Sequence, residues 1–194
     1  DYLGKVETSI KKLDGFIKDI IDFSRNARLD IDFTKVDFNI LIDEIVNDIK
    51  YLGDKIELSV NTKVNGTDFR TDNKRLTIIL RNLISNSYRY ADRNKAINIL
   101  NITVDINSQK AIIVIEDNGV GRKRSAKLNQ NRNKTHKSLG AKITESRLRL
   151  INTMHGDEVL INYIDLVDEN GMPSGTKVEI SLPVEKNKML EVIN

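Results

Sequence analysis

The order of helix-like and strand-like segments predicts an α+β fold, a two-layer α/β sandwich in which helices cover one face of a mixed sheet. Two segments with helical periodicity, 38–51 and 72–90, are interleaved with strand-like segments, and a hairpin over 158–182 closes the chain. A long helix precedes this block. With 194 residues, 39% of them hydrophobic, and no cysteine, the chain can bury an apolar core without disulfides. We expect an appended helix over 1–30 and one domain over 31–194.

The first segment, 1–29, has the pattern of an oligomerising helix. Its apolar residues are spaced by three and four positions, which forms a heptad seam. The seam consists of Leu3, Val6, Ile10, Leu13, Ile17 and Ile20. Because no second long heptad helix follows, we expect the partner helix to belong to another chain; the alternative is packing against the helix's own domain.

The domain itself is predicted element by element. A linker over 30–37 runs into a short strand, and Asp72 is a candidate N-cap for the helix that ends near Tyr90. The inner face of that helix is predicted to hold Leu76, Ile79, Leu80, Leu83, Ile84 and Ser87. The other expected elements are strands near 56–60, 67–70, 97–106, 110–116, 158–167 and 176–182, a helix over 139–154, and a turn at Asn170–Gly171.

Positive charge is concentrated in one segment, 122–137, which has seven Lys and Arg residues and no acidic residue. The segment carries +7, and the rest carries 24 minus 28, or −4. A nucleic-acid-binding protein usually spreads its basic residues over a face, so we expect no nucleic-acid partner. Two interpretations remain, a solvated surface loop and a flexible cationic lid over a polyanion such as a nucleoside triphosphate.

Three short motifs carry candidate chemistry. Asn82, Asn86 and Arg89 share one helix face, where amide oxygens suit Mg²⁺ and a guanidinium suits phosphate. A strand ends in Asp117, whose carboxylate could accept a hydrogen bond from an exocyclic amine. Gly119 and Gly121, which follow it, would let the backbone approach a flat ring or a phosphate closely. Small residues around Gly140 open a helix whose free N–H groups could bind phosphate. Taken alone, each motif has a structural alternative: the polar outer face of a helix, which is the favoured interpretation of the first motif, a tight turn for the second, and a helix cap for the third.

The order of these motifs resembles the catalytic and ATP-binding domain of bacterial sensor histidine kinases. That domain belongs to a wider superfamily with the gyrase-type ATPases and a heat-shock chaperone. The resemblance covers roughly 35–185, and the segment 1–29 resembles the second helix of the kinase dimerisation bundle. It implies the histidine-kinase type of two-layer sandwich, with ATP and Mg²⁺ as cofactors.

The resemblance assigns roles on the asparagine helix. Asn86 matches the magnesium-binding asparagine of the family, and Asn82 matches the earlier asparagine of the same motif. Arg89 stands where the family usually has a phosphate-contacting lysine. Tyr90 matches an aromatic residue that often packs on the adenine.

It also assigns the residues around the purine. Asp117 matches the carboxylate that binds the adenine amino group, with Gly119 and Gly121 beside it. Thr176 matches the threonine near the adenine. Gly140 matches a glycine of the next motif, and residues 122–137 match the ATP lid.

Two departures from the family stand out. Ser138 replaces the usual first glycine of its motif. The phosphate-accepting histidine of the family lies on the first bundle helix, but the two histidines here, His136 and His155, lie elsewhere. We infer that the chain is a fragment cut between the two bundle helices, or a degenerate member, so no catalytic residue is assigned within it.

The resemblance implies a histidine kinase that transfers the ATP γ-phosphoryl to an upstream histidine, for relay to an aspartate on a response regulator. A homodimer would form through the N-terminal helix. The alternatives are a serine kinase or ATPase of the same superfamily and a non-catalytic nucleotide-binding or dimerisation module. Hydrolytic members carry a glutamate where Asn82 stands. The longest aliphatic run, 111–115, is too short to cross a bilayer, so we expect a cytoplasmic chain anchored, if at all, through upstream segments.

Overall fold

The structure is a computed structural model that describes Val6 and residues 32–52, 56–125 and 160–184. The chain divides into two units, 1–31 and 32–194. In the first unit the described residue is Val6, which is helical and exposed. The remainder of the predicted N-terminal helix and the predicted helix over 139–154 lie outside the described residues.

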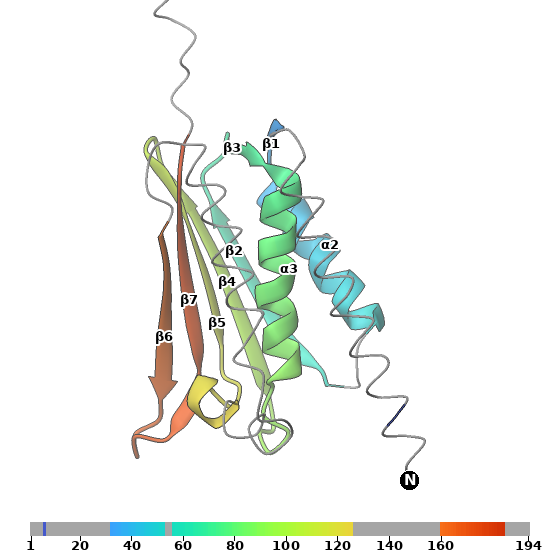
Figure 1. The fold of residues 1–194 in the computed structure, drawn as a ribbon, viewed down its shortest axis with the longest axis vertical. Helices are drawn as coiled ribbons and strands as arrows, with labels where there is room; N and C mark the ends of the chain where they lie inside the picture. The colour runs from blue at the N-terminus through green and yellow to red at the C-terminus, as the bar shows by residue number, and fades with distance from the viewer. Residues whose placement is uncertain (1–5, 7–31, 53–55, 126–159, 185–194) are drawn as a thin grey trace, which may run out of the picture. The chain divides into compact units, whose positions relative to one another are not determined.

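The described part of the second unit is a mixed sheet with helices on one face, as the sequence predicted (Figure 1). Its helices are α2 (Phe38–Leu52) and α3 (Asn73–Arg89). Its strands are β1 (Phe33–Lys35), β2 (Leu58–Asn65), β3 (Arg70–Asp72), β4 (Asn98–Ile106), β5 (Lys110–Asp117), β6 (Leu160–Val167) and β7 (Pro173–Pro183). Strand β3 begins later than the predicted 67–70, because Gly66 and Asp68 have φ of 90° and 65°, which is not the extended backbone of a strand.

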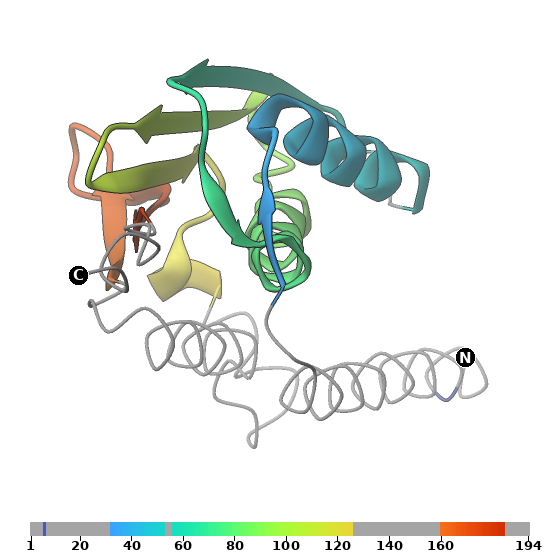
Figure 2. The same cartoon turned by 90° about the horizontal axis from the view of Figure 1, so that it is seen from above.

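The main sheet has the order β2-β4-β5-β7-β6, and β1 pairs with β3 in a separate two-stranded sheet. Strands β2 and β4 run parallel, whereas β4–β5, β5–β7 and β6–β7 are antiparallel. Viewed from above, α2 and α3 lie on the same side of this sheet (Figure 2). This topology places the end of β5 between β4 and β7.

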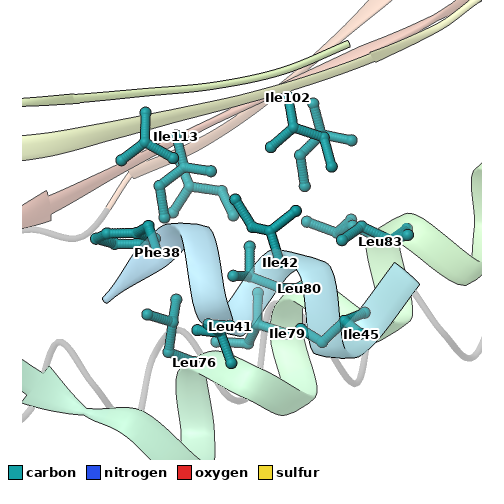
Figure 3. Packing of buried hydrophobic residues seen from close by; sticks show 14 of the residues in the cluster. Phe38, Leu41, Ile42, Ile45, Leu76, Ile79, Leu80, Leu83, Ile102 and Ile113 are labelled. Atoms are coloured by element: carbon teal, nitrogen blue, oxygen red, sulfur yellow. The ribbon is translucent and has the colours of Figure 1, made fainter. Parts of the chain in front are cut away.

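Apolar side chains fill the layer between the two helices and the sheet (Figure 3). The completely or almost completely buried members include Phe38, Ile42, Ile45, Leu76, Ile79, Leu80, Leu100, Ile102, Ile113 and Ile115. All six residues predicted for the inner face of α3 are buried. Burying one such aliphatic side chain contributes about 1.5–3 kcal/mol, so this layer is the main source of stability.

Helix α3 begins at a polar cap, as predicted. The Asp72 carboxylate accepts a hydrogen bond from the Arg75 N–H at 2.9 Å and also pairs with the Arg75 guanidinium. Both side chains are buried, and the cap satisfies one of the free N–H groups that every helix start exposes. The helix is thereby anchored at one end, and its other end lies beside the end of β5 (Figure 1).

Candidate functional site

The last turn of α3 contacts the turn that follows β5. The backbone N–H of Val120 donates to the carbonyl of Tyr90 at 2.9 Å. The Ser87 hydroxyl lies 3.4 Å from Oδ2 of Asp117. Residues that are 30 positions apart in the sequence therefore meet at one end of the sandwich. The resemblance assigned the asparagine helix and the acidic strand end to one site, and the structure brings these two elements together.

Asp117 is the best-defined polar group at this junction. Its Oδ1 accepts the Gly119 N–H at 2.9 Å, and its backbone lies opposite Thr176 of β7. Burial raises the pKa of Asp117 above its ordinary value; hydrogen bonds from Gly119, Ser87 and the Thr176 backbone, together with the charge of Lys95, partly oppose that rise. The result is a carboxylate that is partly withdrawn from water and surrounded by donors.

The predicted residues of this element lie between the middle of α3 and its C-cap. Asn82 and Asn86 are half-buried and, being four residues apart, lie on one face. Arg89 is exposed in the last turn. Tyr90 is half-buried and caps the helix, with its N–H donating to the Asn86 carbonyl at 2.9 Å.

Glycines allow the backbone segments of this region to pack against one another. A Cβ on Gly119 would lie 2.4 Å from the Tyr90 carbonyl oxygen. A Cβ on Gly175, which precedes Thr176, would lie 2.0 Å from the Asp117 carbonyl oxygen. The sequence interpretation was that Gly119 and Gly121 let backbone approach a ring or phosphate. The structure adds another requirement, since Gly119 sits directly against the end of α3.

Three contributors were not singled out from the sequence. Ser87 was predicted only as an inner-face residue, yet its hydroxyl faces Asp117. The Asn118 side chain accepts from the Ile99 N–H at 2.8 Å and donates to the Ile97 carbonyl at 3.1 Å, which ties the turn to β4. Lys95 donates to the carbonyls of Asn118 and Ser174. Asn118 carries a turn signal in the sequence, but nothing in the pattern around Lys95 marks it.

The start of the basic segment is held on two sides. Residues 122–125 form one helical turn. The Arg122 guanidinium lies 4.9 Å from the centre of the Tyr163 ring and 3.8 Å from an Asp165 oxygen. Arg124 pairs with Asp92 at 3.3 Å. Part of the positive charge predicted for a lid is therefore matched by acids of the β6 edge and of the loop after α3.

A small cavity of about 110 Å³ opens beside this turn. It is lined by Gly121, Arg122, Lys123, Asp165, Leu166, Val167, Gly171, Pro173 and Gly175. It shares glycines with the Asp117 region but is too small for a nucleotide. The remaining predicted site residue, Gly140, lies outside the described residues, as do Ser138, His136, His155 and lid positions 126–137.

The donor set at the end of α3 suits a hard cation with phosphate ligands. The described residues contain no group of three or more His, Cys, Asp or Glu side chains able to hold a metal ion by themselves. Asn82 and Asn86 instead offer half-buried amide oxygens, and Mg²⁺ commonly combines few protein ligands with substrate phosphates. The residues present therefore fit a magnesium ion that arrives with a nucleotide.

Several solved structures with a similar fold are histidine kinases. The Acinetobacter baumannii histidine kinase AdeS aligns with a TM-score of 0.67 at 20% identity, over 91% of this chain and 81% of that one. The mycobacterial sensor histidine kinase MprB aligns with a TM-score of 0.56 at 18% identity, over 79% of this chain and 99% of that one. The histidine kinase domain of the Erythrobacter litoralis blue-light-activated kinase EL346 aligns with a TM-score of 0.53 at 15% identity, over 74% of this chain and 59% of that one. At these identities the likeness defines the fold, that of a histidine-kinase ATPase domain.

The family assignment comes from the sequence match. The family described as "Histidine kinase-, DNA gyrase B-, and HSP90-like ATPase" matches residues 71–186, more than half of the chain. The chain belongs to this family. A search of curated proteins found no match. None of the helices in the described part of the chain combines the length and apolar character needed to span a membrane.

Proposed function

We propose that this chain is the ATP-binding catalytic part of a two-component sensor histidine kinase. The observation that carries the proposal is the Asp117 carboxylate, half-buried at the end of β5 beside the last turns of α3. Its Oδ1 accepts the Gly119 N–H at 2.9 Å, its Oδ2 has a long contact of 3.4 Å with the Ser87 hydroxyl, and the Thr176 backbone is a third donor. An ionised carboxylate has about four acceptor positions, so acceptor capacity remains for a ligand.

A carboxylate that accepts hydrogen bonds, as Asp117 does, favours adenine over guanine. An ionised carboxylate only accepts hydrogen bonds, and the 6-position of adenine carries an amino donor. Guanine has an acceptor oxygen at that position, and two acceptors facing each other in a partly buried site leave both unpaired. Asp117 is therefore proposed to bind the adenine amino group, with Thr176, Gly119 and Gly121 around the purine and Tyr90 against its ring.

The triphosphate would extend along the end of α3. Asn86, with Asn82 beside it, would provide amide oxygens for Mg²⁺, and Arg89 would pair with a phosphate. When bound, Mg²⁺ offsets the negative charge of the phosphates. Gly140 and the cations of 122–137 complete the proposed set, with Arg122 and Arg124 holding the start of that segment to the domain.

The proposed reaction transfers the γ-phosphoryl group from ATP to a histidine nitrogen on an upstream helix and releases ADP. The response-regulator aspartate would then receive the group, and the dimer would form through the N-terminal segment. Asn82 supports transfer over hydrolysis, because an amide cannot take a proton from water at neutral pH. The proposed role of the chain is to hold ATP intact until the acceptor docks.

Adenine binding is tested with Asp117→Asn in the full 194-residue chain. A hydrogen bond to a charged group is worth about 1.5–3 kcal/mol, so we expect ATP affinity to fall about 10- to 100-fold by calorimetry in the presence of Mg²⁺. The matched control is Asp43→Asn, an exposed acid on α2, which should bind as the wild type does. Unchanged affinity in Asp117→Asn would reject the adenine contact.

Phosphoryl transfer is tested with γ-labelled ATP. We expect the chain to bind ATP, to release phosphate slowly, and not to label itself. Strong self-labelling at a histidine would show that the acceptor lies within the chain. Rapid phosphate release would indicate a hydrolytic ATPase, and acid-stable labelling of serine would indicate a serine kinase.

A further inference from the structure

Lys95 connects three segments at the end of the sandwich. It lies in the loop between α3 and β4, and its ammonium donates to the Asn118 carbonyl at 2.5 Å and to the Ser174 carbonyl at 3.1 Å. These acceptors are 23 and 79 residues away in the sequence. One side chain thus joins the loop after α3, the turn after β5 and the start of β7.

The backbone under Lys95 is itself anchored. The Lys95 N–H donates to the Asp92 carbonyl at 3.1 Å, and the Asp92 N–H donates to the Asn98 side chain at 3.0 Å. Asp92 and Asn98 are both buried. The ammonium therefore projects from a fixed loop, and its contacts can hold the two carbonyls in place.

The two carbonyls belong to the segments that position Asp117. Asn118 directly follows Asp117, and Ser174 precedes Gly175, whose backbone packs against the Asp117 carbonyl. An ammonium group has three donors and can serve both oxygens at once. Among the described residues, no acidic side chain forms an ion pair with Lys95.

We propose that Lys95 is a positioning residue for purine recognition: its ammonium holds the turn that carries Asp117 against the start of β7. This inference rests on the proposed function, because it assigns Lys95 to the same nucleotide site. Lys95 acts through Asp117 and the backbone and does not need to touch the nucleotide.

The same geometry gives Lys95 an electrostatic effect on Asp117. The groups facing that carboxylate are the Ser87 hydroxyl from α3, the Gly119 N–H of the turn, the Thr176 N–H from β7 and the charge of Lys95. Lys95 lowers the pKa of Asp117, while burial raises it by more. Removing the charge should raise that pKa further, so Asp117 would become protonated, and lose its acceptor role, at a higher pH.

The experiment compares Lys95→Met, Lys95→Arg and the control Lys110→Met in the full chain. Lys110 is an exposed lysine at the opposite end of β5. ATP affinity is measured by calorimetry over a range of pH, with thermal unfolding recorded for each variant. We expect Lys95→Met to weaken ATP binding about tenfold at neutral pH, the loss of one charge-assisted contact pair. The acid limit, defined as the pH below which ATP binding is lost, should also be higher in Lys95→Met than in the wild type.

Lys95→Arg should restore most of the affinity and the wild-type acid limit, and Lys110→Met should match the wild type. Wild-type affinity in Lys95→Met would overturn the inference. The inference would also be overturned if the loss of ATP affinity in Lys95→Met only followed the fraction of unfolded protein, with an unchanged acid limit and no recovery of affinity in Lys95→Arg. If the wild-type chain itself fails to bind ATP, the proposed function fails first, and this inference falls with it.

Discussion

The layer between the helices and the sheet and the loop end of the sandwich are built in different ways. The layer is apolar, with side chains such as Ile42, Leu80 and Ile113 completely buried (Figure 3). The loop end, which comprises residues 87–95, 117–124 and 173–176, is held by hydrogen bonds to backbone groups and by glycines in close contact. Apolar burial is non-directional, whereas hydrogen bonds require defined geometry.

This difference separates stability from binding. A substitution in the apolar layer removes buried area and leaves a cavity, but the loop end can keep its geometry in every molecule that remains folded. A substitution at the loop end removes little apolar area but can displace Asp117. The two regions should therefore respond oppositely in measurements of unfolding and of nucleotide affinity.

The largest expected effect on stability comes from Ile113→Ala. Ile113 is completely buried on the helix-facing side of β5, and such truncations cost about 2–5 kcal/mol of unfolding free energy. ATP affinity per folded molecule should stay within about twofold of the wild type, since distant sites behave independently. Urea unfolding and calorimetry provide the two measurements.

The neighbouring Ile112 gives a matched control for this prediction. It is half-buried and points to the opposite face of the same strand, so Ile112→Ala should destabilise the domain less. Equal losses in Ile112→Ala and Ile113→Ala would contradict the assignment of the core to the helix-covered face.

The apolar layer was largely predictable from the sequence because periodicity reports burial directly. The residues predicted for the inner face of α3 are buried, and the Asp72 cap forms as expected. These features depend on spacing within a single element. The strand order could not be predicted in the same way, because it depends on which distant segments pair.

The loop end was predictable only in part, for the same reason. Asp117 was predicted as a site residue because a carboxylate at a strand end is visible in the sequence, and its neighbours Gly119 and Gly121 form a local pattern. Lys95 was missed because its partners are remote in the sequence and its role exists only once three loops meet. The Ser87 hydroxyl was missed because helical spacing marks Ser87 as inward-facing but does not reveal the acid opposite it.

Gly175→Ala is expected to reduce stability less than Ile113→Ala does, but to reduce ATP affinity more. The added Cβ would lie 2.0 Å from the Asp117 carbonyl oxygen, and the residue has a φ of 156° that disfavours side chains. The start of β7 must therefore move away from the end of β5. We expect a loss of about 1–3 kcal/mol in unfolding free energy, the usual range for strained backbone. ATP affinity should fall at least about tenfold, because a displacement of Asp117 removes a charge-assisted hydrogen bond.

Gly171→Ala separates backbone strain from the clash. Gly171 has a φ of 73°, but a Cβ there would meet no atom within 4 Å. This variant should lose stability through strain alone while binding ATP as the wild type does. If Gly171→Ala weakened binding as much as Gly175→Ala, the close approach of β7 to Asp117 would not be the cause. If Gly175→Ala kept full affinity, the loop end would tolerate displacement, and the proposed separation between stability and binding would be wrong.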